Sequence, residues 1–199
     1  FGTVKQLKRD MVTEISATLA FSAIQNNDKI GVIFFSDKIE KFIPPKKGRK
    51  HILYIIRELI DFKPESTRTN IQCAIEYLTN VQKKRCTAFM LSDFIDDHDF
   101  QNALTVANRK HDVVALQVYD RRMEELPDVG LLKLRDAETG HEQWVDTSSR
   151  AVRNAHHAWW MQRQEKLNGI FTHSNVDSVS VRTDQDYVKA LLNLFAKRN

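Results

Sequence analysis

The segment "TAFMLSDF", residues 87–94, is a short run of apolar residues that ends at a serine and an aspartate. A continuous apolar run of this length is typical of a strand that is covered on both faces, as in a parallel sheet. Similar runs occur in "DKIGVIFFSD" (28–37) and "DVVALQVYD" (112–120), with segments of helical period between the three. This alternation of strands and helices predicts an α/β fold with a mostly parallel sheet.

The remaining elements follow from the same periodicities. Helical spacing of apolar residues predicts helices at 4–26, 49–62, 71–82, 99–111, about 148–167 and 184–198, and a last strand is expected at 176–181. The strands near 29–36, 87–92, 112–119 and 177–182 are expected to share one sheet.

Two antiparallel features are also expected. The short link Ser36–Lys38 predicts that residues 39–43 turn back beside 29–36 as an edge strand, which Pro44, Pro45 and Gly48 then end. A second hairpin is predicted at about 131–147, around the turn signal Glu138-Thr139-Gly140. Because its strands alternate polar and apolar residues, it should lie outside the main sheet or extend its edge, as a partner contact or a structural flap.

Bulk composition points to one domain covering residues 1–199. The chain is 42% hydrophobic, which suits a single buried core, and its net charge of +4 is too small and dispersed to indicate nucleic-acid binding. It contains no apolar run long enough for a membrane helix, so we expect a cytoplasmic protein, although the first residue is Phe1 and any upstream segment would be invisible. Cys73 and Cys86 fit no metal-ligand spacing and are expected to be free, buried thiols.

The candidate chemistry lies where strands end. Ligands of open α/β sheets gather at the carboxyl ends of the strands, and Asp93 follows a predicted strand while Thr69 precedes a predicted helix. A carboxylate and a hydroxyl are oxygen ligands of the kind that Mg²⁺ requires. Thr69 could equally cap its helix, and Asp93 could cap or turn the chain.

Other residues are interpreted structurally. Adjacent His156 and His157 cannot share a metal from one helix, and Trp159, Trp160 and Leu167 are expected to pack on the sheet. The acidic run 96–99 is expected to complement a helix N-terminus, and the basic segment "PPKKGRKH" (44–51) to be a solvated loop, although it could hold a phosphate. The chain has no Walker lysine motif, GxGxxG or nucleophile elbow, which argues against an enzyme.

Several segments together resemble a known family. They are "DKIGVIFFSDKIEKFIPPKKGRKHILYIIREL", "STRTNIQCAIEYL", "AFMLSDFID", "KHDVVALQVYD", "RDAETG" and the ending "VDSVSVRTDQDYVKALLNLFAKR". Their order and spacing are similar to those of bacterial von Willebrand factor A-like proteins of the domain of unknown function fifty-eight family, whose members are often encoded beside MoxR-type AAA+ ATPases. The resemblance implies a doubly wound sheet with helices on both faces and a metal-ion-dependent adhesion site at its carboxyl edge.

The resemblance also assigns site residues. In that family the site combines an Asp-x-Ser-x-Ser turn after the first strand, a threonine and a later aspartate. "TRTNIQCAI" matches the second segment and implies Thr69, with Thr67 as the alternative, and "LSDF" implies Asp93. Phe1-Gly2-Thr3 resembles the residues just after the serine turn, so the first strand and its ligands are expected to be missing, leaving a gap or a swapped strand beside 29–36.

These observations lead to two main functional hypotheses, and a third, nucleic-acid binding through the basic loop 44–51, would show a steep salt dependence. The first is a non-enzymatic protein-interaction module with a truncated or degenerate adhesion site, working with a MoxR-type AAA+ ATPase in protein assembly or maturation. In it, Mg²⁺ would bind the intact protein but not bind this chain tightly. The alternative is a metal-dependent hydrolase or nucleotide-binding enzyme that uses the same crevice, which would need a general base or nucleophile beside Asp93.

Overall fold

The structure is a computed structural model and describes residues 7–136 and 139–198. Its strands are β1 (Ile30–Phe35), β2 (Ile39–Lys46), β3 (Thr87–Ser92), β4 (Asp112–Tyr119), β5 (Leu131–Arg135), β6 (Glu142–Asp146) and β7 (Asp177–Arg182). Its helices are α1 (Lys8–Gln25), α2 (Arg49–Asp61), α3 (Ile71–Val81), α4 (Gln101–Lys110), α5 (Arg121–Glu124), α6 (Arg150–His173) and α7 (Tyr187–Arg198). The predicted α/β class is confirmed. The expectations for Phe1-Gly2-Thr3 and Glu138 lie outside the described residues.

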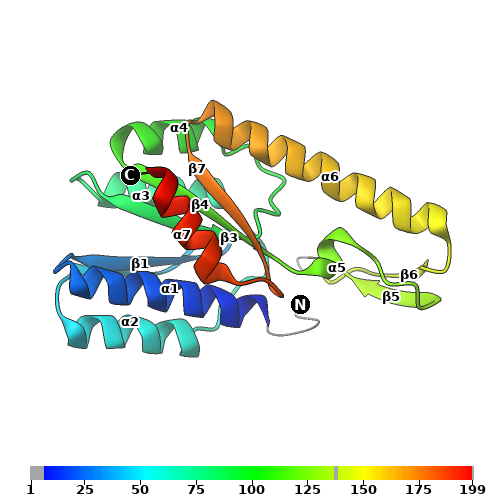
Figure 1. Ribbon diagram of the computed structural model, residues 1–199, viewed down its shortest axis with the longest axis horizontal. Helices are drawn as coiled ribbons and strands as arrows, with labels where there is room; N and C mark the ends of the chain where they lie inside the picture. The colour runs from blue at the N-terminus through cyan, green and yellow to red at the C-terminus, as the bar shows by residue number, and fades with distance from the viewer. Residues whose placement is uncertain (1–6, 137–138, 199) are drawn as a thin grey trace.

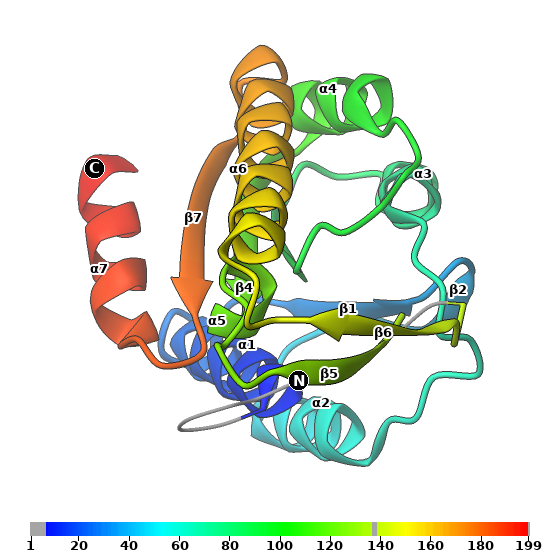
Figure 2. The same cartoon turned by 90° about the vertical axis from the view of Figure 1, so that its right-hand side faces the viewer.

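The centre of the fold is a parallel sheet of three strands in the order β3-β4-β7. Side chains of a strand alternate between its two faces, and β4 uses both. Val113 and Ala115 belong to the core under α3, α4 and α6, whereas Val114, Leu116 and Val118 belong to the core under α1 and α7. Figures 1 and 2 show the helices on either side of this sheet. The continuous apolar run of β4 therefore results from burial on both faces.

The prediction that all four main strands share one sheet is wrong. Among the described residues, β1 pairs only with β2, in antiparallel orientation, and these two strands form a separate sheet. The antiparallel direction of β2 agrees with the short link that precedes it. The separation of β1 from β3 agrees with the expected gap beside residues 29–36. The β1–β2 pair is instead packed around its own small core of Phe34, Ile43 and Ile55, the last from α2.

The predicted end of β2 is also wrong, because the strand continues through Pro44 and Pro45 to Lys46. Proline is tolerated in a strand that has a neighbour on one side only, since its missing N–H can face away from that neighbour. The pairing is irregular at Gly31, where an added Cβ would lie 2.7 Å from the Ile43 carbonyl oxygen and 2.9 Å from the Pro45 nitrogen. Glycine at position 31 thus permits the close approach of the proline-containing strand.

The hairpin β5–β6 is antiparallel and separate from the parallel sheet, as predicted. Figure 1 shows it projecting beneath the far end of α6. Arg153 of α6 ties its base to the helix, through hydrogen bonds to the carbonyl oxygens of Thr147 (2.6 Å) and Ser148 (2.9 Å). Among the described residues, no helix combines the length and hydropathy needed to cross a bilayer.

α6 extends six residues beyond its predicted end at 167. Leu167, Ile170 and Phe171 are all buried in the core that α6 shares with α3 and α4, so packing keeps this segment helical despite Gly169. Trp160 packs on the sheet as expected, with its ring 5.2 Å from that of Tyr119. Trp159 does not: it is 41% exposed and lies under the guanidinium of Arg163. The prediction for Trp159 was wrong because adjacent residues lie about 100° apart around a helix, so that Trp160 is buried while Trp159 is partly exposed.

A thiol and an imidazole lie together at the amino-terminal edge of the parallel sheet, where β3 and β4 begin. The Sγ of Cys86 lies 3.6 Å from Nδ1 of His111, which is fully buried, and both cysteines are free and half-buried. Burial raises the pKa of the Cys86 thiol. Burial, and then the nearby charges of Lys110 and Arg85, lower the pKa of His111. Both groups are thus held in their neutral forms.

This pair generates a prediction about pH. Because the pKa of His111 is lower in the folded chain than its ordinary value of about 6.5, the unfolded state binds the proton more readily. The free energy of unfolding should therefore be highest above about pH 6.5 and fall as the pH decreases through the folded pKa. Urea unfolding at a series of pH values measures this slope.

His111→Asn should reduce the pH slope while lowering overall stability. The control is His173→Asn, which removes an exposed imidazole at the end of α6 and should retain the slope. A slope that His111→Asn leaves unchanged would contradict this account.

Candidate functional site at the carboxyl edge of the sheet

Asp93 directly follows β3. A side chain of the central strand, β4, holds its backbone in place. The buried side chain of Gln117 in β4 donates a hydrogen bond to the Asp93 carbonyl oxygen (3.2 Å) and accepts one from Ser180 of β7 (2.7 Å). Phe94 then adopts a positive φ of 56°, which is costly for a bulky residue. Its ring is buried beside that of Phe171, at 5.1 Å, and this packing holds the turn.

The carboxylate of Asp93 is bound by a cation from the same chain. Its Oδ2 lies 2.6 Å from Nζ of Lys8, in the first turn of α1, while its Oδ1 accepts a hydrogen bond from the amide of Ile95 (3.2 Å). The Lys8 and Asp93 side chains are 23% and 25% exposed. Nζ of Lys8 also lies 3.7 Å from the sulfur of Met123. An ammonium group thus lies where a carboxylate would otherwise attract a metal ion.

The loop that carries Thr69 reaches the same edge. Asp96 Oδ2 accepts a hydrogen bond from the amide of Ile71 (2.7 Å), the first residue of α3, and thereby joins this loop to the one that carries Asp93. The amide of Asn70 donates to the Ser36 carbonyl oxygen after β1 (2.9 Å). Three loops therefore meet at one edge. Thr69 is half-buried and Thr67 is exposed, and direct proximity of Thr69 to Asp93 stays a prediction.

Thr69 does not cap α3, so that alternative is wrong. The N-cap of α3 is Asn70, whose side chain accepts from the Cys73 amide (2.9 Å). The side chain of Asp96, with no exposed surface, acts as a second cap from a different loop. Asp99 accepts from the amide of Gln101 (3.0 Å) at the start of α4, as expected for the acidic run. These carboxylates stabilise helix ends.

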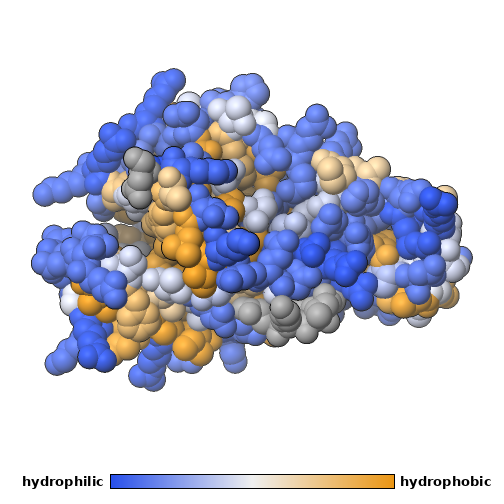
Figure 3. All heavy atoms as spheres, viewed as in Figure 1, coloured by the Kyte–Doolittle hydropathy of each residue, from blue (hydrophilic) through white to orange (hydrophobic). Residues whose placement is uncertain are grey.

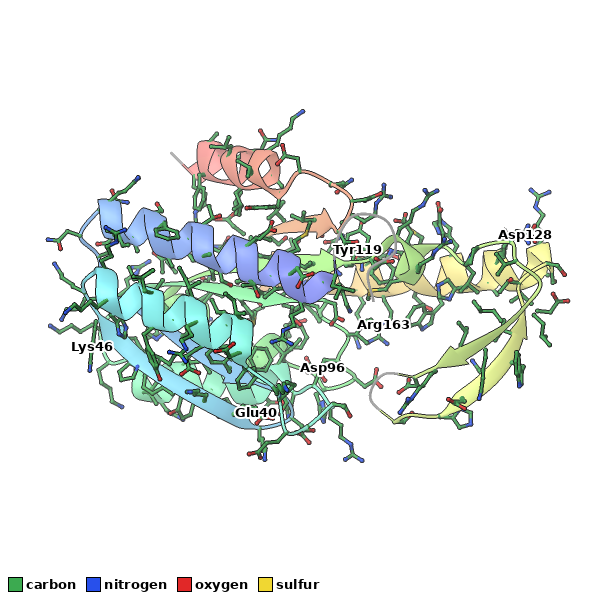
Figure 4. All side chains as sticks on the ribbon, turned by 90° about the horizontal axis from the view of Figure 1, so that it is seen from below. Glu40, Lys46, Asp96, Tyr119, Asp128 and Arg163 are labelled. Carbon is green, nitrogen blue, oxygen red and sulfur yellow. The ribbon has the colours of Figure 1, made fainter. Side chains whose placement is uncertain are left out.

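α6 also contacts this edge. Arg163 donates to the carbonyl oxygen of Asp96 (3.3 Å) and to the carboxylate of Asp97 (3.2 Å), and Figure 4 shows Asp96 and Arg163 from below. The Asp97 side chain is 94% exposed. His156, which is half-buried, and His157, which is exposed, hydrogen-bond the carbonyl oxygens of Met123 and Glu124. They are surface or partly packed residues, as expected, and the expectation that they bind no metal stays a prediction.

A further carboxylate lies beside this edge. Glu40 accepts hydrogen bonds from the Ser36 hydroxyl (2.7 Å) and from the amide of Ser66 (3.2 Å). The Ser36 bond, followed by those from the backbone of residues 66 and 65, holds the pKa of Glu40 below its ordinary value despite some desolvation. Glu40 therefore stays ionised and fixes the loop before α3.

Whether these residues fit Mg²⁺ can be judged from their other bonds. Mg²⁺ keeps several waters and needs well-placed, available oxygen atoms. Asp93 is bound by Lys8, and Asp96 by Ile71 and His98, so their oxygens are already used. Among residues 7–136 and 139–198, no group of three or more His, Cys, Asp or Glu side chains could hold a metal ion. The donor set of the described chain therefore does not fit a tight Mg²⁺ site.

Comparisons with known proteins agree with this architecture. The model of the family described as "Protein of unknown function DUF58" matches residues 1–166. The chain belongs to the DUF58 family. Uncharacterized protein Rv1480 of Mycobacterium tuberculosis is 28% identical over 205 residues, covering 100% of this chain and 63% of Rv1480. The same figures apply to Mb1516 of Mycobacterium bovis, so the chain spans less than two thirds of these relatives.

Two solved structures share the fold of this DUF58 chain. BatB from Bacteroides thetaiotaomicron is similar with a TM-score of 0.58 and 16% identity, over 95% of this chain and 87% of BatB. An aerotolerance-related membrane protein from Bacteroides fragilis has a TM-score of 0.61 and 17% identity, over 95% and 88% of the two chains. At these identities the likeness concerns the fold alone.

The sequence did not reveal Lys8, Gln117 or Arg163 as parts of the edge. Lys8 is 85 residues from Asp93 and resembles any other lysine in a helix. Gln117 could have been noticed in the sequence, because it is a polar residue within the apolar run of β4. A buried amide in a central strand signals a specific partner.

The contacts of Asp93 and Asp96 at this edge lead to a prediction about Mg²⁺ binding. We expect isothermal titration calorimetry of the chain with Mg²⁺ to give no saturable binding in the micromolar range. Lys8→Met frees the Asp93 carboxylate but supplies no additional oxygen, so any binding it permits should remain millimolar. Micromolar Mg²⁺ binding by the unaltered chain would show that Lys8 does not exclude the ion.

Proposed function

We propose that this DUF58 chain is a protein-interaction module that is not an enzyme, and that the carboxyl edge of its sheet is the contact surface. The observation that carries the proposal is the partly exposed ion pair of Lys8 and Asp93, which lies where three loops are joined by hydrogen bonds. Asp97 and His98 add exposed polar side chains beside it. Charges held on fixed loops favour specific recognition of a charged partner.

The chemistry of the titratable groups favours binding over catalysis. A general base needs an available lone pair within reach of substrate, and the Asp93 carboxylate is instead bound by Lys8. A nucleophilic cysteine needs a lowered pKa, and burial raises that of Cys86. The Cys86–His111 pair is also at the opposite edge, where β3 and β4 begin. These features disfavour the alternative hydrolase.

The partner we propose, on the family resemblance, is a MoxR-type AAA+ ATPase acting with this chain in protein assembly or maturation in the cytoplasm. The edge would be a degenerate metal-ion-dependent adhesion site, with Thr69 and Asp93 as its remaining residues. In an intact site a cation receives a carboxylate from the partner. Here the ammonium of Lys8, already beside Asp93, would take the place of that cation and make docking independent of Mg²⁺.

Capture of the ATPase by the immobilised chain tests this proposal. Asp93→Asn keeps the shape of the side chain but removes its charge and its ion pair, so we expect capture to weaken about tenfold or more, the effect of losing a central charged contact. Chelation of Mg²⁺ should leave capture by the unaltered chain unchanged.

The matched control is Asp177→Asn at the start of β7, which removes a different ion pair, with Arg198. It should capture the ATPase as the unaltered chain does. Equal losses in the two variants, or absence of capture by the unaltered chain, would refute the proposed surface and partner.

A further inference from the structure

The exposed face of α2 mixes basic and apolar residues. The exposed residues of this helix are Arg49, Lys50, Leu53, Tyr54, Arg57, Ile60 and Asp61. Their spacing of three and four residues places them on one stripe. The opposite side of the helix buries Ile52 and Ile55 completely, the latter against β1 and β2. The helix is therefore fixed to the body of the chain with this stripe outward.

The apolar part of the stripe is large for a solvent-exposed helix. Leu53 is 49% exposed, Tyr54 is 44% exposed and Ile60 is 58% exposed. Isolated exposed apolar residues are normal, but three on one stripe of a short helix form a patch. Figure 3 shows apolar surface over the α1–α2 layer at the lower left, with hydrophilic side chains projecting around it.

The charge of this face is positive and uncompensated. Lys46 and Lys47, both exposed, precede Arg49 and Lys50, and Figure 4 places Lys46 at the end of the molecule where α2 begins. The first turn of α2 contains no acidic residue. In the described part of the chain, none of these four cations forms an ion pair.

The nearby acids have partners of their own. Glu58 pairs with Lys41 at 2.6 Å, and Asp61 pairs with Arg57 at 3.5 Å. The stripe therefore presents a cluster of free cations next to apolar side chains, with no free acid between them.

We propose that this face of α2, with the segment 46–50 before it, binds the surface of an anionic phospholipid bilayer. Lysine and arginine would contact the lipid headgroups, and Leu53, Tyr54 and Ile60 would enter the boundary between headgroups and acyl chains. Interfacial helices combine these two contributions, apolar burial and attraction to anionic lipid. The helix would lie along the membrane surface without crossing it.

A bilayer fits this surface better than other anionic partners. A nucleic acid would pair with the cations and could stack a base on Tyr54, but it would leave the exposed side chains of Leu53 and Ile60 in water. The stripe is also a convex helix face, not a groove that would hold a peptide. A bilayer satisfies both the charges and the apolar side chains of one outward-facing helix.

Cosedimentation of the chain with vesicles tests the contribution of the basic residues to membrane binding. Vesicles of phosphatidylcholine with about 30% phosphatidylserine should bind the chain, and vesicles of phosphatidylcholine alone should bind it much more weakly. Each basic residue near such a surface contributes about fivefold in affinity, so Arg49→Gln with Lys50→Gln should weaken binding about 25-fold. Lys83→Gln with Lys84→Gln removes two exposed cations elsewhere and should change binding less than about twofold.

A second pair of variants tests the contribution of the exposed apolar side chains to membrane binding. Leu53→Ser should weaken binding to the anionic vesicles about tenfold, whereas Leu192→Ser, on the exposed face of α7, should not. Circular dichroism verifies that these surface variants fold. Absence of binding to the anionic vesicles, or equal effects of the two members of either pair, would overturn the proposal.

Discussion

The arrangement at the carboxyl edge depends on the ion pair between Lys8 and Asp93. It joins the first turn of α1 to the loop after β3, two segments that lie far apart in the sequence. The pair has a fixed position because Gln117 holds the Asp93 backbone and the buried ring of Phe94 holds the turn that follows. Asp96, three residues further on, then anchors the start of α3. One short loop thus positions two helices.

The same pair determines what the edge can do chemically. A carboxylate neutralised by an ammonium group is a poor ligand for Mg²⁺ and a poor general base, since its charge is already compensated. It remains partly exposed, however, and a partner can still contact both charges. This geometry is the basis on which we propose recognition as the activity of the edge. The α2 face is a separate surface, and its cations lack the internal partners that Lys8 has.

Local patterns in the sequence predicted the elements better than their assembly. The apolar run of β4 identified a strand buried on both faces, and alternation in 131–147 identified a hairpin outside the sheet. The grouping of β1 with β3 failed, because an apolar run records burial but not which neighbour supplies the hydrogen bonds. The length of α6 was underestimated for a related reason: tertiary packing of Ile170 and Phe171 outweighs the helix-weakening effect of Gly169.

The site was predictable only in part. Asp93 stood out because it ends an apolar run. The loop before α3 is joined to the loop after β3 by the bond from the Ile71 amide to Asp96, whereas the proximity of Thr69 to Asp93 stays a prediction. Lys8 was not predictable, because nothing in the sequence distinguishes a lysine that will meet a distant aspartate. From the sequence, weak Mg²⁺ binding was expected because ligands are absent. The ammonium group of Lys8 beside Asp93 is a second reason for that expectation.

A double-mutant cycle on the Lys8–Asp93 pair tests the central claim most directly. The free energy of unfolding in urea would be measured for the chain, for Lys8→Met, for Asp93→Asn and for the double variant. Because the two side chains are in contact but about one-quarter exposed, the account predicts a coupling energy of about 1 kcal/mol. A coupling energy within about 0.3 kcal/mol of zero would mean that the two residues act independently, and it would contradict the claim that this ion pair organises the edge.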